Sequence, residues 1–102
     1  MTIETILKDR QKQHGNYEDR ADLTIDLQNT IDNYRYNLHD HLPNYQLDAL
    51  RMICVKIARI VNGDNNYADH WADIAGYSQL VINILQSSYN DMTVIKSKPR
   101  AK

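Results

Sequence analysis

Lys56, Arg59, Asp69 and Asp73 are the residues whose types and spacing are best suited to chemistry. Lys56 and Arg59 lie three residues apart in an apolar helical stretch, and Asp69 and Asp73 lie four apart at the start of the next one. Residues three or four apart share one face of a helix, and only a short polar turn separates the two stretches. We therefore expect two cations and two carboxylates to converge across this turn, where they can hold a phosphorylated ligand with or without a divalent metal. The same charges can also pair with one another, and the sequence leaves both interpretations open.

The two cations interrupt an otherwise apolar helix, which has two explanations. Either their stems lie along the edge of the core while their charged ends reach water, or they point into a polar cleft and bind phosphate oxygens. Arg59 is the stronger candidate for phosphate binding because its planar guanidinium can bond two oxygens at once.

A second pair of carboxylates, Asp19 and Asp22, lies three residues apart early in another predicted helix. Four carboxylates on two facing helices would form an oxygen-rich site of the kind that Mg²⁺ prefers. The metal set predicted in this way comprises Asp19, Asp22, Asp69 and Asp73. The alternative is that they are solvated first-turn residues that complement the positive ends of their helices. Aromatic residues between positions 67 and 71 favour a pocket beside the second pair.

The four histidines do not form a metal site by spacing. His39 and His41 lie two apart in a predicted loop and are interpreted as surface residues. His14, next to Gly15, and His70, beside the aspartate pair, are better candidates for contact with a ligand. The chain has no glycine-rich phosphate loop, no nucleophile elbow and no Cys-His pair with supporting spacing. No catalytic residue can be assigned, and covalent catalysis has no support.

Length and composition indicate one ordinary globular domain. The chain has 102 residues, 25% of them charged, and a formal net charge of −1, which argues against a nucleic-acid binder that neutralises phosphates. Its single cysteine, Cys54, lies in an apolar run and cannot form a disulfide within the chain. Neither a membrane span nor a signal peptide is apparent. We therefore expect a protein of a reducing cytoplasm, with no membrane partner.

Hydrophobic periodicity predicts an all-α fold, a compact four-helix bundle. The expected helices cover residues 3–13, with Thr2 as N-cap, then a long helix after Asn16, then 43–61, and finally 68–89. Gly15 and Gly63 are expected to end helices, Gly63 in a left-handed conformation, and Gly76 is expected to mark a close approach of a helix or a ligand. The third helix should be the most buried element, and its apolar segment 49–61 predicts self-association into a homo-oligomer. Residues 1–90 are expected to form the domain and residues 91–102 a flexible basic tail.

Three strings carry a resemblance to a known group of proteins: HGNY at 14–17, KIARI at 56–60 and DHWADIAGY at 69–77. Together they resemble small phage and prophage proteins of unassigned function, which are similar to the MazG-like, all-α nucleotide pyrophosphohydrolase superfamily. The resemblance implies an oligomeric helical bundle with a nucleotide site between helices, in a protein of a bacterial host cytoplasm. The site residues carried over from the family are Asp69, Asp73, Lys56 and Arg59. Tyr17 and Tyr77, which lie in the quoted strings, are further candidate ligand-binding residues. The enzymes of that superfamily hold metal with an E-x-x-E motif, which this chain lacks because its only glutamates are Glu4 and Glu18.

The sequence supports three hypotheses about function. The first is a phage-encoded protein that binds or sequesters a nucleotide or nucleotide-derived signal, with counter-defence as its role. The second is a magnesium-dependent nucleoside triphosphate pyrophosphohydrolase, in which aspartates replace the missing glutamates and Mg²⁺ is the cofactor. The third is a protein-binding inhibitor of a host factor, because seven tyrosines and no phenylalanine suit an amphipathic interface. The candidate ligand-binding set common to the first two is Lys56, Arg59, Asp69, His70, Asp73, Tyr77, His14 and Tyr17.

Overall fold

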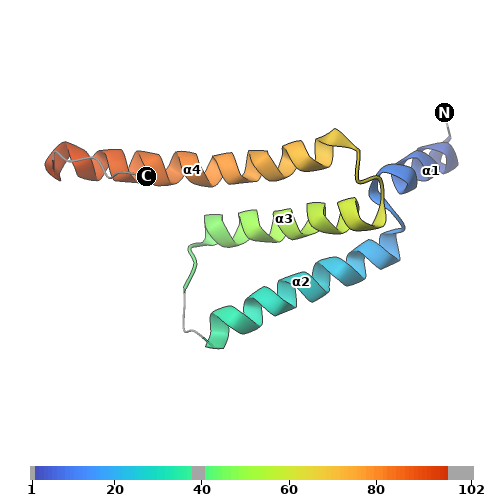
Figure 1. Ribbon diagram of the computed structural model, residues 1–102, viewed down its shortest axis with the longest axis horizontal. Helices are drawn as coiled ribbons and strands as arrows, with labels where there is room; N and C mark the ends of the chain where they lie inside the picture. The colour runs from blue at the N-terminus through green and yellow to red at the C-terminus, as the bar shows by residue number, and fades with distance from the viewer. Residues whose placement is uncertain (1, 38–40, 97–102) are drawn as a thin grey trace.

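Four helices make up the fold. The structure, a computed structural model, describes residues 2–37 and 41–96. Within them lie α1 (Ile3–His14), α2 (Tyr17–Asn37), α3 (Asn44–Asn62) and α4 (Ala68–Lys96) (Figure 1). The described residues contain no strand. The all-α four-helix bundle predicted from the sequence is confirmed.

The first two helices begin at the predicted caps. The Thr5 backbone N–H donates to Thr2 Oγ1 at 3.2 Å, and the Asp19 N–H donates to Asn16 Oδ1 at 3.2 Å. Each bond satisfies one of the N–H groups that a helix start leaves without a partner. The third helix starts directly after Pro43, whose extended backbone serves as its N-cap. The local sequence therefore sets these helix starts.

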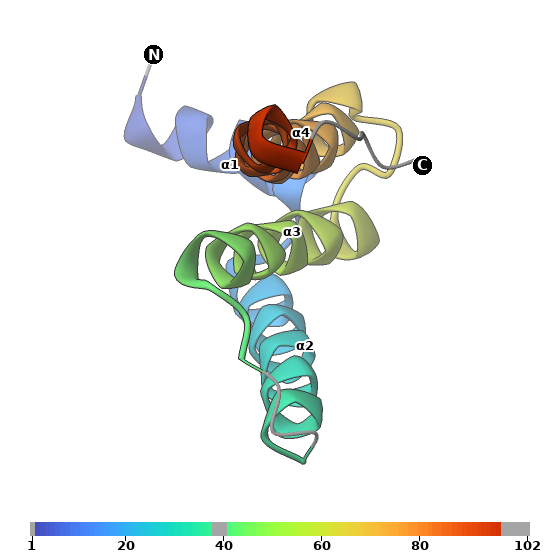
Figure 2. The same ribbon diagram turned by 90° about the vertical axis from the view of Figure 1, so that its left-hand side faces the viewer.

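Helix α3 is the central element, as predicted. It packs against α2 on one side and α4 on the other, while α2 and α4 do not contact each other in the described part of the chain (Figure 2). Its buried residues include Ala49, Cys54 and Ala58. Leu50 and Val61 of the apolar segment 49–61 stay exposed. The self-association predicted from this segment stays a prediction.

Helix α4 is longer than predicted. It ends at Lys96 rather than near position 89, so residues 91–96 of the expected tail are helical. No glycine or proline occurs between Tyr77 and Ser97, and the next helix-breaking residue is Pro99. The remainder of the predicted tail and the predicted loop residue His39 lie outside the described residues. His41 is exposed and lies in the connection before α3, as expected.

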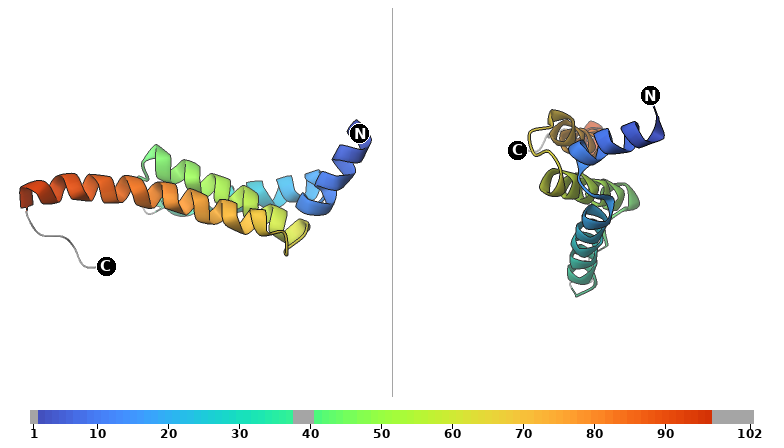
Figure 3. Two further views of the ribbon diagram at one scale, coloured as in Figure 1. Left: turned by 90° about the horizontal axis from the view of Figure 1, so that it is seen from above. Right: turned by 90° about the vertical axis from the view of Figure 1, so that its right-hand side faces the viewer.

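The molecule is elongated. Its principal extents are 58 × 33 × 21 Å, and α4 continues well past the first turn of α3 (Figure 3). None of the described helices combines the length and the apolar character that a membrane span would need. The candidate site lies at the opposite end of the fold, where α1 meets α2 and α3 meets α4.

Candidate functional site

Two turns cross in direct backbone contact at this end of the fold. One is the α1–α2 turn at Gly15, and the other is the α3–α4 turn at Gly63. The Asp64 N–H donates to the Gln13 carbonyl at 3.1 Å, so a carbonyl left free at the end of α1 is bonded by the other turn. The crossing holds the end of α1 and the start of α2 against the end of α3 and the start of α4.

Both glycines are required by this crossing, for different reasons. Gly15 has φ +87°, and a Cβ on it would lie 2.5 Å from the backbone carbon of Asn62. Gly63 has φ −118°, so the predicted left-handed conformation is wrong. A Cβ on Gly63 would lie 2.5 Å from the Gln13 oxygen and 2.6 Å from the Gly15 nitrogen. Gly63 is therefore needed for close approach, whereas Gly15 is needed for both its backbone conformation and space.

A pair of histidines is built onto the crossing. His70 is 1% exposed, and its Nε2 lies 2.8 Å from the Gln13 carbonyl oxygen and 3.3 Å from His14 Nδ1. Because a carbonyl can only accept, His70 Nε2 carries the proton and His14 Nδ1 presents its lone pair. Tyr67 packs its ring edge-on against His70, with the ring centroids 4.9 Å apart. The two predicted histidines are thus brought together, and His70 has a structural role in the turn crossing.

The pKa of His14 reports a positively charged environment. Burial lowers this pKa, and Arg59, His70, Arg20 and Lys56 lower it further, to about 4. His14 is therefore neutral at neutral pH. Cations from α2 and α3 converge on the end of α1.

One of the predicted charge pairings is made. Lys56 Nζ lies 2.9 Å from Asp73 Oδ2, and this hydrogen bond from Lys56 holds the pKa of Asp73 below its usual value. Lys56 is 9% exposed, so its stem is packed in the core while its ammonium reaches the half-exposed carboxylate. The interpretation that these charges pair with each other is confirmed for Lys56 and Asp73.

Arg59 is different because it has no such partner. Its Nε is buried without a hydrogen-bond partner, and so is Nε of Arg20 in the first turn of α2. No ion pair is made by Arg20 or Arg59 to any residue of 2–37 or 41–96. Burial lowers the pKa of Arg59, and Arg20 lowers it further, whereas Asp73 and Tyr77 act in the opposite direction. Three cations therefore meet near a single carboxylate that is already bonded to one of them.

Arg20 is the site residue that sequence reasoning missed. Its guanidinium carbon lies 4.9 Å from the centre of the Tyr17 ring, three residues earlier, which is within the range of a cation–π contact. A cation in the first turn of a helix opposes the positive end of the helix dipole. That unfavourable placement was the feature of the sequence that could have identified Arg20 as a site residue. Through Arg20, the exposed ring of Tyr17 is joined to the cluster.

The predicted four-carboxylate metal set does not assemble. Asp73 is bonded to Lys56, and Asp69 lies beside Tyr67, where its carboxylate raises the pKa of that phenol. Asp19 and Asp22 are exposed on α2, and the backbone N–H of Asp19 donates to the side chain of the N-cap residue Asn16. In residues 2–37 and 41–96, no group of three or more His, Cys, Asp or Glu side chains could hold a metal ion. The prediction that these aspartates surround one ion is therefore wrong, and Asp69 lies at the margin of the cluster.

The cluster that the structure does assemble is called here the junction cluster. It contains the side chains that act on one another at the meeting point of the four helices. These are His14, Arg20, Lys56, Arg59, His70, Asp73 and Tyr77. Six of the seven were predicted as ligand-binding residues from the sequence.

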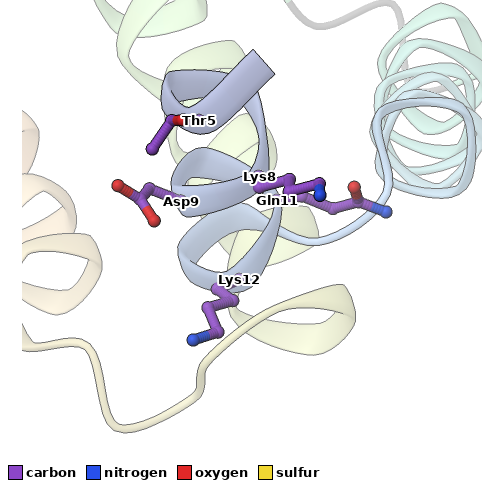
Figure 4. Close-up of a pocket in the computed structure, with 5 residues that line it drawn as sticks. All are labelled: Thr5, Lys8, Asp9, Gln11 and Lys12. Carbon is purple, nitrogen blue, oxygen red and sulfur yellow. The ribbon is translucent and has the colours of Figure 1, made fainter. Parts of the chain in front are cut away.

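A separate hollow of about 600 Å³ lies against α1 and is distinct from this cluster. The side chains at its edge, including Thr5, Asp9 and Lys12, all come from α1 and spread around that helix (Figure 4). Side chains of one exposed helix cannot surround a ligand from several sides. This hollow is therefore a surface concavity and not part of the site.

Comparison with known proteins identifies the family. A family model described as Domain of unknown function (DUF6378) matches residues 2–85. The chain belongs to the DUF6378 family. No curated protein and no solved structure matches it. The DUF6378 match spans α1, α2, α3 and the part of α4 that packs on α3, so it includes every residue of the junction cluster. It does not test the expected phage origin or MazG-like relationship, which stay predictions.

Proposed function

We propose that this chain binds a small phosphorylated ligand of the nucleotide class at the junction cluster. The observation that carries the proposal is the pair of arginines, Arg20 and Arg59, whose buried Nε atoms have no hydrogen-bond partner. Buried polar groups are nearly always bonded to protein, water or a ligand. An anion between the two guanidiniums would supply acceptors to both.

The electrostatics of the cluster favour an anion over a neutral ligand. Arg20 and Arg59 lie close enough for each charge to disfavour the other, and Lys56 adds a third cation whose bond goes to Asp73. A phosphate carries about two negative charges and three acceptor oxygens. Its binding would offset the repulsion and satisfy the free N–H groups, because guanidinium and phosphate match in bidentate geometry.

Aromatic rings beside the cations favour a nucleotide over inorganic phosphate. Tyr17 is 71% exposed and already stacks one face against Arg20, which leaves its other face free to stack with a base. Tyr77 is half-buried on the α4 side of Arg59. In this proposal the arginines bind phosphate oxygens, Tyr17 contacts the base, and His14 stays a neutral imidazole beside the phosphate.

Sequestration of a nucleotide by a phage-encoded protein in a host cytoplasm is the biological form of this proposal. It rests on the sequence resemblance described above. Hydrolysis would require a metal centre other than the aspartate set predicted from the sequence, because those carboxylates are spread over separate surfaces.

Isothermal titration of the full chain with ATP, AMP and pyrophosphate tests the proposal. We expect Arg59→Gln to weaken nucleotide binding by about tenfold to a hundredfold, since a hydrogen bond to a charged group contributes about 1.5–3 kcal/mol. Arg51→Gln is the matched control. It also removes one cation from α3, but Arg51 is paired with Asp32 at 3.5 Å and lies outside the cluster.

Three results would count against the proposal. These are no heat with any of the probes, equal losses in the two variants, or a loss that is fully restored by low salt in both. Chromatography of the nucleotide after incubation with Mg²⁺ separates retention from turnover. Recovery of unchanged nucleotide after denaturation of the protein supports sequestration.

A further inference from the structure

The middle of α4 has the composition of a helix that is buried on several sides. No charged residue occurs from Ile74 to Asn90, although a helix that lies on the surface of a monomer normally carries charge on its solvent face. Yet, apart from the contact of His70 with the end of α1, α4 packs only against α3 in the described part of the chain. Leu80, Ile84 and Leu85 are 59%, 41% and 46% exposed. The sequence of α4 is thus more apolar than its surroundings in one chain require.

Two parallel rows of residues run along α4 with alternating spacings of four and three, the spacing of helices that pack side by side. The inner row is His70, Ile74, Tyr77 and Val81, which are buried or half-buried. The outer row is Trp71, Ala75, Ser78, Ile82 and Leu85, all of them exposed. One row is used by α3, and the other has no partner helix from the described residues of this chain.

The outer row forms one wall of an apolar groove. The groove has a volume of about 390 Å³ and runs between α3 and α4. Ser78, Ile82 and Leu85 line it from α4. On the α3 side it is lined by Gln46, Ala49, Leu50 and Ile53. None of these lining residues is charged, so a strongly charged partner would gain nothing from this surface.

The molecule exposes more surface than a closed monomer of its mass. Its accessible surface is 7969 Å², whereas a folded monomer of this mass is expected to expose about 5,900 Å². Its radius of gyration is 17.8 Å, against about 13 Å expected for a closed domain of this length. A stable dimer buries about 800 Å² on each partner, which is less than half of the excess. The surface that a second copy would need is therefore available.

We infer that a second copy of this chain docks in the α3–α4 groove, with the outer rows of the two α4 helices packed against each other about a two-fold axis. The two helices cross near Ala75 and Ser78, because these small side chains allow the closest approach of the backbones. The α3–α4 pairs of two chains then complete a four-helix layer that one chain leaves open. The α3 wall of this groove includes Ala49, Leu50 and Ile53 of the segment 49–61, from which the sequence predicted an oligomer.

Light scattering with size-exclusion chromatography on the full chain gives the first test. We expect a mass of twice 11.9 kDa for the unaltered chain. Ile82→Asp places a carboxylate in the groove and should raise the dimer dissociation constant by at least about tenfold. Asn83→Asp is the matched control. It adds the same charge one residue away on the other side of α4, and its side-chain oxygen can still accept from Gln79. Far-UV circular dichroism checks that both variants remain helical.

Crosslinking gives the second test and locates the contact. Under mild oxidation Ser78→Cys should form a disulfide between chains, because a residue at a two-fold crossing faces its own copy within the short reach of a disulfide. Asn83→Cys should not, and the native Cys54 is buried. A monomer at all protein concentrations overturns the inference. So does a dimer that Ile82→Asp leaves intact and that Ser78→Cys does not crosslink, since either the groove or the crossing would then be wrong.

Discussion

Substitution of Gly63 by alanine is the sharpest test of the turn crossing that supports the junction cluster. The new Cβ would lie 2.5 Å from the Gln13 oxygen and 2.6 Å from backbone atoms of His14 and Gly15. All three are main-chain atoms, which cannot move aside by changing a rotamer. The two turns must separate, and the Gln13 carbonyl moves away from the two donors that bond it.

The expected cost follows from those contacts. The Gln13 oxygen accepts from the Asp64 N–H at 3.1 Å and from His70 Nε2 at 2.8 Å. Each bond contributes about 1 kcal/mol, and loss of the Gln13 carbonyl leaves the buried His70 Nε2 with only its longer contact to His14 Nδ1 at 3.3 Å. Together with strain in the turns, we expect Gly63→Ala to lower the free energy of unfolding by about 3 kcal/mol. For a domain of this size this corresponds to a fall in Tm of about 12–24 °C.

Gly76→Ala is the matched control, because it makes the same chemical change within a helix that has space for it. A Cβ there would meet nothing within 4 Å, so no other helix of the described chain approaches Gly76 closely, and the expected close helix approach is wrong. Alanine should raise the free energy of unfolding by up to about 1 kcal/mol. Urea unfolding followed by circular dichroism measures both variants. If Gly63→Ala were as stable as Gly76→Ala, the backbone crossing described here would be refuted.

Three further predictions concern charged and buried groups. The pKa of His14 is lowered to about 4 in the folded chain, so the unfolded chain binds a proton at higher pH than the folded one, and the free energy of unfolding should fall as pH drops from about 6.5 to about 4. His14→Gln should flatten this pH dependence in urea titrations. An NMR titration that gives His14 an ordinary pKa would contradict the prediction. Lys56→Met should change the free energy of unfolding by no more than about 1 kcal/mol, because the pair it breaks is partly exposed and the apolar stem is kept. Asp73→Asn should cost more, about 1–3 kcal/mol, because it leaves the buried Lys56 ammonium without its counter-charge. Equal effects of the two variants would argue against this pairing. Burial raises the pKa of the Cys54 thiol, so Cys54 should react with a thiol reagent at neutral pH only after denaturation. Rapid reaction of the native chain would show that α3 is not covered as described.

Local sequence carried most of the information about the secondary structure. The caps at Thr2 and Asn16, the start of α3 after Pro43 and the central position of α3 were all predicted and are all confirmed. These features depend on neighbouring residues and on hydrophobic period, which a single sequence contains. The end of α4 was placed too early, although no glycine or proline occurs between Tyr77 and Ser97 to stop the helix.

For the candidate site, the sequence determined which residue types were available, and the tertiary structure decided how they pair. Spacing placed Lys56 and Arg59 on one helix face. Only the packing of α4 on α3 determined that Asp73 pairs with Lys56 and that Arg59 Nε has no hydrogen-bond partner. Arg20 entered the cluster, and Asp19 and Asp22 stayed outside, because the direction of a side chain across two helices depends on their relative rotation. The same holds for the glycines, since nothing local shows that Gly63 lies against the end of α1. Contacts between residues distant in sequence are set by the packing of whole elements, and that information lies in the assembled fold.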